Sequence, residues 1–317
     1  MQIALTFDIE VWCRSWATLE RDFPDSFDRY IFGRSRRGQF ALPRLLETLD
    51  RYGLHGIFFV EPLFAGRFGV EPLATIVGLI RAAGQEVQLH LHPEWTDEAR
   101  TPWLPDAPKQ KRQHLAYYSL DEQARLIEVG AALLEQAGAP RPTAFRAGSF
   151  AANADTYPAL QRNGILIDSS VNMTLPQSIP DMRRDADHFH PFTCSGISVY
   201  PMSVFRDGFG RLRHAQIGAC SFAELSEAIA CAARLGWSQF VLLAHNFELL
   251  KSGSSEPDGI VCRRFERLAR FLRDHAEHFP TSNLPPLQAT RDHPPLPHVG
   301  VLGTGRRHLE QLIRRIG

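Results

Sequence analysis

The order of apolar runs along the chain is the feature that most constrains its fold. Short β-rich runs at 3–7, 56–60 and 86–91 are separated by two stretches with helical spacing. The first stretch ends at Gly53 and carries leucines at i, i+3, i+4 and i+7, namely Leu42, Leu45, Leu46 and Leu49. This β-α-β-α-β order predicts parallel strands that are connected by helices.

The alternation continues through the rest of the chain. Two Ser-x-x-Glu sequences, Ser119 with Glu122 and Ser221 with Glu224, predict capping boxes that each begin a helix. Further helices are predicted at 72–84 and 261–272, and further strands at 143–146, 165–168, 197–201, 239–244 and 287–290. About seven or eight strands, with no Gly-rich phosphate loop, favour a parallel α/β barrel over a nucleotide-binding open sheet.

The length of 317 residues allows two domains or one barrel of ~250 residues with a tail. We predict one catalytic barrel over 1–290, and a Pro-rich segment with a basic C-terminal helix over 291–317. The loops predicted at 12–38, 95–118 and 171–195 are long, and long loops often carry function. The aromatic residues of the first loop are suited to stacking on sugar rings or to packing on the barrel.

The composition excludes several classes of protein. The 35 Lys and Arg residues balance the 35 Asp and Glu residues, so no net charge attracts nucleic acid. No apolar run approaches the ~20 residues of a membrane span. The five cysteines are scattered without a C-x-x-C pair, which argues against a disulfide framework and a thiolate zinc site. With no signal-peptide pattern before the first strand, we expect a cytoplasmic protein, and the sequence leaves its oligomeric state open.

Ionisable residues lie at the predicted ends of two strands. Asp8 and Glu10 are two residues apart, so both carboxylates lie on the same face of an extended segment. They can form part of a reactive site, or they can be a helix cap or a solvated strand end. His90 and His92 have the same spacing, and two imidazoles on one face can bind a single metal ion. Glu94 follows closely and is a competing ligand.

Three other strand ends carry Arg146, Asp168 and His245. An arginine there can hold a carboxylate ionised or simply face solvent, and a histidine can act as an acid or base or cap a helix. Together, these groups suit metal-assisted hydrolysis of an amide or ester. The metal lowers the pKa of a water molecule, a carboxylate removes its proton, and a histidine protonates the leaving group.

The motifs, in this order, resemble those of the polysaccharide deacetylases, a group of carbohydrate esterases (family 4) that share the NodB-homology domain. The segment from Thr6 to Glu10 is similar to the family motif T-F-D-D-G. The resemblance implies that Asp8 is the catalytic base and that Glu10 binds the metal. The family motif H-x-x-x-H implies His90 as a ligand, with His92 as the second histidine, while Glu94 stands at the family's second position. The family fold is an irregular (β/α)7 barrel.

The same resemblance assigns the other strand-end residues. Arg146 is expected to orient Asp8, and nearby backbone N–H groups are expected to help hold the oxyanion. Asp168 is expected to tune the catalytic histidine, and His245 is expected to be the general acid. The implied cofactor is a divalent metal ion, with Zn²⁺ as the first candidate.

We therefore expect a metal-dependent N-deacetylase whose partner is a carbohydrate that carries an N-acetyl group. A cytoplasmic location favours a nucleotide- or lipid-linked sugar in O-antigen, lipopolysaccharide or exopolysaccharide assembly over an exported polysaccharide. Two alternatives remain. One is an amidase that acts on a small non-sugar amide, and the other is a non-catalytic carbohydrate-binding descendant. The presence of both Asp8 and His245 argues against the second.

Overall fold

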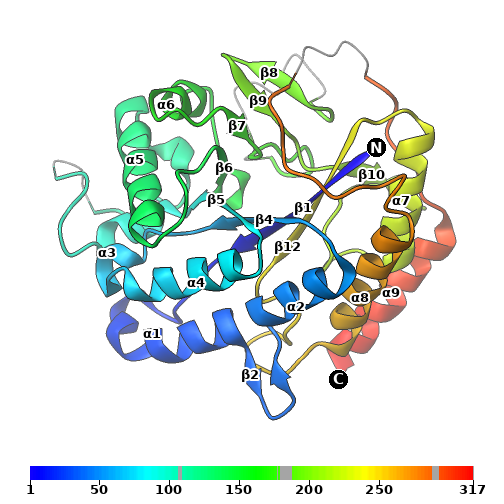
Figure 1. Cartoon of the computed structure of the whole chain (residues 1–317), viewed down its shortest axis with the longest axis horizontal. Helices are drawn as coiled ribbons and strands as arrows, with labels where there is room; N and C mark the ends of the chain where they lie inside the picture. Colours follow the sequence, from blue (N-terminus) through cyan, green and yellow to red (C-terminus); the bar gives the residue numbers. More distant parts are fainter. Residues whose placement is uncertain (106–108, 177, 179–187, 288–292, 317) are drawn as a thin grey trace. The chain divides into compact units, whose positions relative to one another are not determined.

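A computed structural model of the chain describes residues 1–105, 109–176, 178, 188–287 and 293–316 (Figure 1). Its main sheet has eight strands, in the order β12 (Gln239–His245), β1 (Gln2–Ile9), β4 (Gly56–Val60), β5 (Glu86–Leu91), β6 (Ala144–Ala147), β7 (Ile167–Asp168), β9 (Ile197–Val199) and β8 (Phe192–Cys194). The pairs β12–β1, β4–β5, β5–β6, β6–β7 and β7–β9 are parallel, and β8 pairs antiparallel with β9.

Helices connect most of these strands, as the apolar periodicity predicts. They are α1 (Leu19–Phe27), α2 (Leu42–Tyr52), α3 (Ala65–Phe68), α4 (Glu71–Ala82), α5 (Leu120–Gln136), α6 (Thr156–Arg162), α7 (Phe222–Arg234), α8 (Gly259–Asp274) and α9 (Val301–Ile316). Short helical turns occur at η1 (Trp16–Thr18), η2 (Asp28–Phe32), η3 (Pro93–Glu98), η4 (Leu115–Tyr117) and η5 (Gly148–Phe150). Two small hairpins pair β2 (Arg34–Ser35) with β3 (Gly38–Gln39), and β10 (Val204–Arg206) with β11 (Leu212–His214).

The chain divides into two compact units. The first comprises Met1–Gly56, Ser203–Asn283 and Pro294–Gly317, and the second comprises Ile57–Met202 and Leu284–His293. In the first unit, every residue of β1 after Gln2 is buried, as expected of a strand covered on both faces. In the second unit, the residues of β4 from Ile57 to Val60 are all buried for the same reason. The domain boundary predicted after residue 290 stays a prediction.

Local sequence signals explain where several helices begin and end. Both predicted capping boxes are confirmed: the Ser119 side chain accepts from the N–H of Glu122 and the Ser221 side chain from that of Glu224, while each glutamate reaches back to the N-cap. Gly53 ends α2 in the left-handed conformation, with φ of 63°.

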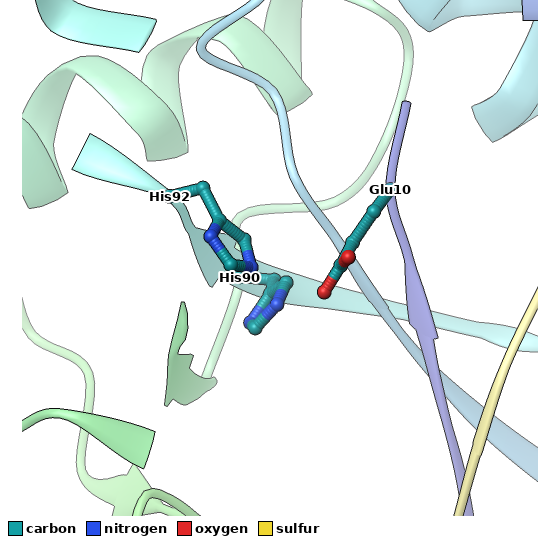
Figure 2. A group of neighbouring side chains, drawn as sticks. All are labelled: Glu10, His90 and His92. Carbon is teal, nitrogen blue, oxygen red and sulfur yellow. The ribbon is translucent and has the colours of Figure 1, made fainter. Parts of the chain in front are cut away.

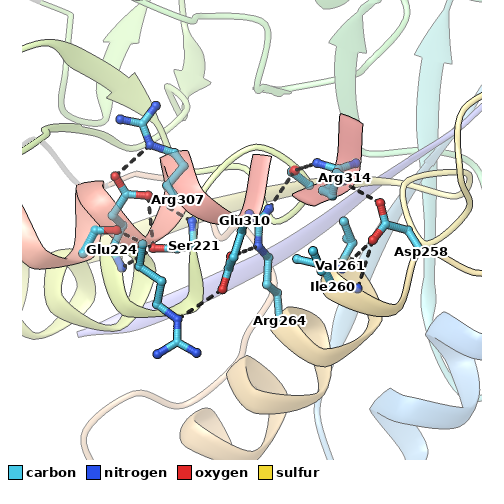
Figure 3. Close-up of polar contacts among 12 residues, drawn as sticks. Ser221, Glu224, Asp258, Ile260, Val261, Arg264, Arg307, Glu310 and Arg314 are labelled. Atoms are coloured by element: carbon cyan, nitrogen blue, oxygen red, sulfur yellow. Dashed lines mark hydrogen bonds and ion pairs between the residues drawn. The ribbon is translucent and has the colours of Figure 1, made fainter. Parts of the chain in front are cut away.

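The C-terminal helix α9 lies beside α7 and α8 within the first unit (Figure 1). Buried ion pairs attach it (Figure 3). Arg307 lies 2.8 Å from a carboxylate oxygen of Asp207 and 2.9 Å from one of Glu224, and Arg264 lies 2.7 Å from Glu310. The helix is therefore part of the packed first unit.

The sequence prediction differs from the structure in several places. The short helices α3 and α6 were not predicted, and β8 lies in the segment 171–195 that was predicted to be a loop. The segment 12–38 is not an open loop, because its apolar side chains Leu19, Phe23 and Ile31 are buried and form part of the helical segments α1 and η2. The two hairpins escaped prediction because strands of two or three residues are too short to show an alternating pattern. The strand predicted at 287–290 lies outside the described residues except for Leu287.

No helix in the described part of the chain is both long and apolar enough to cross a membrane. All five cysteines are free thiols.

Candidate active site

The first unit brings together two carboxylates and a histidine. β1 and β12 run parallel with Asp8 directly opposite His245, so both side chains come at the carboxyl ends of their strands. Ligand atoms of Asp8, Glu10 and His245 all lie within 4.8 Å of one another. Both carboxylates are buried, with Asp8 only 2% exposed. Buried, closely spaced carboxylates at strand ends are typical of a functional site rather than a solvated edge.

Two neighbouring side chains hold Glu10 in one orientation. The indole N–H of Trp12 donates to Oε2 of Glu10 at 2.6 Å, while Oε1 lies 4.0 Å from Nε2 of His245. The buried side chain of Asn246 binds the backbone of Glu10 twice, since its Oδ1 accepts from the N–H at 3.1 Å and its amide donates to the carbonyl at 3.0 Å. One carboxylate oxygen of Glu10 is therefore fixed and the other faces His245.

Glu248 is the hydrogen-bond partner of the histidine. Nδ1 of His245 donates to Oε1 of Glu248 at 2.7 Å, and Oε2 of Glu248 accepts from the N–H of Gly218 at 2.7 Å. Burial lowers the pKa of His245, but the hydrogen bond to Glu248 and the negative charges of Glu10, Glu248 and Asp8 raise it to about 9. His245 is thus protonated at neutral pH and can donate a proton from Nε2.

In the second unit, His90 and His92 lie side by side at the end of β5 (Figure 2). Their ring centroids are 4.9 Å apart, and they are 1% and 6% exposed. Nδ1 of His90 lies 2.8 Å from the carbonyl oxygen of Arg146 on the neighbouring strand. Since a carbonyl can only accept, Nδ1 donates the hydrogen bond, and Nε2 is the ring nitrogen that carries the lone pair in this tautomer.

His92 packs against a glycine and beside the competing ligand. Its Nδ1 is 3.5 Å from Oε1 of Glu94, which is also buried. A Cβ atom at Gly148 would lie 2.8 Å from the His92 ring and 2.7 Å from the Leu91 carbonyl, closer than van der Waals contact allows. The glycine therefore leaves the space that His92 occupies.

Arg146 and Asp168 follow adjacent strands of the second unit. Arg146 is fully buried; its Nε donates to the Ser169 carbonyl at 3.2 Å, and its guanidinium lies 4.3 Å from the centroid of the Phe59 ring. Asp168 accepts from the hydroxyl and the N–H of Ser170. Burial raises the pKa of Asp168 to about 6, although Ser170 and Arg146 act to lower it. The predicted roles of both residues remain predictions, and Glu248 is the described partner of His245 at Nδ1.

Comparison with known proteins addresses the fold. No protein-family model matches the sequence, and no curated protein matches it. Among solved structures, a Mycobacterium smegmatis protein assigned as a polysaccharide deacetylase matches 91% of this chain and 94% of its own, at 19% identity and a TM-score of 0.52. The chain has the polysaccharide deacetylase fold. The (β/α)7 barrel of NodB type expected from the sequence is thereby confirmed.

Two other structures were matched with lower TM-scores. The family 4 carbohydrate esterase from Streptomyces lividans, solved with acetate, is 15% identical over 90% of this chain and 93% of its own, with a TM-score of 0.45. A family 4 pseudoenzyme from Bacillus anthracis is 13% identical over 86% of this chain and 60% of its own, with a TM-score of 0.42.

Besides the residues that support Glu10 and His245, two further features of this polysaccharide deacetylase fold were not predicted. Glu61 follows β4, is 1% exposed, and accepts from the N–H of Leu63 at 2.8 Å; burial raises its pKa to about 8. The same strand-end rule that selected Asp8 would have found Glu61. Ser149 and Phe150, after β6, both adopt left-handed backbone angles, with φ of 55° and 56°. Such strain in non-glycine residues occurs preferentially at functional sites.

Proposed function

We propose that this protein is a metal-dependent hydrolase that removes the N-acetyl group of an acetamido sugar. The observation that carries the proposal is the cluster of Asp8, Glu10 and His245, in which a carboxylate and a protonated histidine lie within 4.8 Å. Amide hydrolysis needs a base for the attacking water and an acid for the leaving amine, and this pair supplies both. The polysaccharide deacetylase fold supports the same reaction class.

Glu10 of the first unit and His90 and His92 of the second are the proposed metal ligands, because the resemblance to the family motifs implies these ligands. A carboxylate with two imidazoles is a donor set that suits a zinc-like ion with an open coordination position. The Arg146 carbonyl supports this assignment because it holds His90 in the tautomer that can bind a metal. Glu94 is the alternative to His92. When bound, such an ion polarises the acetyl carbonyl and lowers the pKa of water.

The side chains of this chain perform the proton transfers. Asp8 accepts the proton of the attacking water, and Arg146 orients that carboxylate. His245 gives its Nε2 proton to the leaving amine, while Glu248 holds Nδ1 and stabilises the imidazolium. Acetate and a free amino sugar are the products. The cytoplasmic location and the role in O-antigen or exopolysaccharide assembly stay predictions.

The test is acetate release from model acetamido sugars by the zinc-loaded protein, together with metal analysis. We expect Asp8→Asn and His245→Ala each to lower turnover by roughly 10²–10⁴-fold with metal content near that of the wild type, because neither is a proposed ligand. Glu10→Gln and His90→Ala are expected to lose metal as well as activity.

Three results would contradict this assignment. Unchanged acetate release by Asp8→Asn and His245→Ala would show that Asp8 is not the base and that His245 is not the acid. If the protein bound no divalent metal, the assignment of the metal ligands would be wrong, and a carbohydrate-binding role would be favoured. If the protein hydrolysed small non-sugar acetamides but no acetamido sugar, its substrates would be non-sugar amides.

A further inference from the structure

The C-terminal helix α9 directs its large apolar side chains to solvent. Eight large hydrophobic side chains are exposed in the described part of the chain, and five of them belong to α9: Val301, Leu302, Leu309, Leu312 and Ile313. Their exposed fractions range from 51% to 87%. With 3.6 residues per turn, these five positions fall on one side of the helix. Single exposed hydrophobic residues are common, but a group of them on one helix face marks an interaction surface.

The opposite side of α9 is polar and contacts the rest of the first unit (Figure 3). Arg307 forms the buried ion pairs described above, Arg314 lies 2.6 Å from Asp258, and Glu310 lies 2.7 Å from Arg264. Most surface helices pack their apolar face on the core and turn their polar face to water, so α9 is inverted. Because charged groups attach the helix, its apolar face stays directed to solvent.

The hairpin of β10 and β11 extends this apolar surface. Phe209 lies in the turn between the two strands and is 62% exposed. Its ring centroid is 6.0 Å from that of His308 on α9, and the N–H of Gly208 donates to the Thr304 hydroxyl of α9 at 2.9 Å. The apolar patch is defined here as the six exposed side chains of Phe209, Val301, Leu302, Leu309, Leu312 and Ile313.

The two elements that carry the patch are rich in arginine. Their described arginines are Arg206, Arg211, Arg213, Arg306, Arg307 and Arg314. Their acids are Asp207 and Glu310, whose side chains are only 1% and 16% exposed and pair with arginines. Even when Glu224 and Asp258, the partners of α9 on α7 and α8, are counted with these acids, the arginines outnumber them. The surface around the patch is therefore positive, although the whole chain has zero net charge.

We propose that the apolar patch docks on the surface of a membrane that contains anionic phospholipids. A helix of 16 residues with apolar side chains on one side can lie in the plane of the membrane interface. The leucines and Phe209 then enter the boundary of the acyl chains, while Arg211 and Arg306 lie at the level of the phosphates. This interaction goes beyond the proposed reaction and does not depend on it.

A second copy of the chain is the competing occupant of the patch. A symmetric contact between two copies places the same surface against itself, so each copy would bring its own positive charge to the interface. Like charges oppose association, whereas anionic headgroups attract the same arginines. Six apolar side chains are also few compared with the ~20–30 residues that each partner contributes to a stable interface. Charge complementarity thus favours the anionic membrane.

The test measures how tightly the full-length protein binds vesicles, by co-flotation at increasing lipid concentration. Vesicles of phosphatidylcholine and phosphatidylglycerol in equal parts should bind the protein at least about tenfold more tightly than vesicles of phosphatidylcholine alone. Added salt should weaken binding to the anionic vesicles, because it screens the attraction between arginines and headgroups.

Leucine variants test the apolar contact. Leu302→Ser and Leu309→Ser should each weaken binding to the anionic vesicles by about tenfold, because one leucine no longer enters the acyl boundary. Leu166→Ser is the matched control, since Leu166 is a 49% exposed leucine of the second unit that lies outside the patch. Its vesicle binding should equal that of the wild type. Thermal unfolding of all three variants shows that they are folded.

An arginine variant tests the charge, and a tryptophan reports the depth. Arg306→Gln should weaken binding to the anionic vesicles by about fivefold. Arg125→Gln should not, although Arg125 of α5 is equally exposed, at 51%, and also pairs with a glutamate of its own helix. Phe209→Trp should keep its affinity, and phospholipids with brominated acyl chains should quench its fluorescence more than that of the wild type.

Three results would overturn the proposal. The first is that the wild type binds neither kind of vesicle. The second is that Leu309→Ser and Leu166→Ser bind vesicles equally well. The third is that sedimentation without lipid shows a dimer that Leu309→Ser converts to a monomer while its vesicle binding stays unchanged, which would assign the patch to a second copy of the chain. None of these results depends on acetate release, so the proposed function is tested separately.

Discussion

At the scale of single residues, the pairing of His245 with Glu248 sets the protonation state of the proposed acid. The hydrogen bond and negative charge of Glu248 favour the imidazolium form and act against the effect of burial. A folded-state pKa of about 9, above the unfolded value, means that this group stabilises the fold at low pH. That contribution is lost as the pH rises through about 9.

The corresponding prediction concerns Glu248→Gln. Removing the carboxylate charge should lower the pKa of His245, measured by NMR titration of the metal-free protein. Since the acid must be protonated, the alkaline limb of the pH–rate profile should also move to lower pH. Glu256→Gln, a change of an exposed glutamate in the same unit, is the control. A His245 pKa that is the same in both variants would contradict the assignment of Glu248.

A second prediction at this scale concerns Gly148. In Gly148→Ala, the new Cβ would overlap the His92 ring and the Leu91 carbonyl, so His92 must move. We expect the affinity for zinc to fall by about tenfold or more, as measured by competition with a chelator. Gly78→Ala in α4 is the matched control: its Cβ meets nothing within 4 Å, so zinc affinity should be unchanged. Equal zinc affinity in the two variants would argue against His92 as a ligand.

At the scale of elements, strand register assembles the first half of the site. β1 and β12 are more than 200 positions apart in the sequence, yet their parallel pairing puts Asp8 opposite His245. Asn246 follows His245 in the sequence, and its side chain binds the backbone of Glu10. This contact fixes the path of the chain directly after β1. Parallel strands end at the same edge of a sheet, and for this reason the ionisable groups gather there.

The capping boxes provide a prediction at the element scale. Ser119→Ala and Ser221→Ala each remove one N-cap, which should lower the free energy of unfolding by about 1 kcal/mol in urea denaturation. Ser221→Ala should cost more, because its hydroxyl also donates to the Gly303 carbonyl of α9 at 3.0 Å, and that group would lose its buried partner. A smaller effect for Ser221→Ala than for Ser119→Ala would contradict this interpretation.

At the scale of the whole molecule, α9 belongs to the folded first unit through Arg307. This side chain is 4% exposed and is the ionic partner of Asp207 and Glu224, which are 1% and 0% exposed. The adjacent Arg306 is 51% exposed and pairs with Glu310. Substitutions of these two arginines therefore allow a buried ion pair to be compared with an exposed one on the same helix.

Arg307→Met should lower the free energy of unfolding by about 3 kcal/mol or more, because two buried carboxylates lose their counter-charge. Arg306→Met should cost less than about 1 kcal/mol. Chemical denaturation of both variants gives the comparison. If Arg307→Met were as stable as Arg306→Met, the C-terminal helix would not be anchored through this side chain.

The sequence by itself determined most strands of the main sheet and the longer helices, and it selected the candidate site residues. Apolar periodicity and capping signals act over a few residues, so the main strands and helices could be predicted from them. An ionisable residue directly after a buried strand must lie at the sheet edge, and that rule selected Asp8, His90, His92, Arg146 and His245.

Only the tertiary structure decided which side chains support these groups. Glu248, Asn246 and Trp12 hold the site through side-chain directions that no periodic pattern encodes. The cavity beside His245 is lined by residues of η2, of the turn after β12 and of α9, three segments that lie far apart in the sequence. Local signals depend on neighbours in the sequence, whereas a binding site depends on residues that only folding brings together.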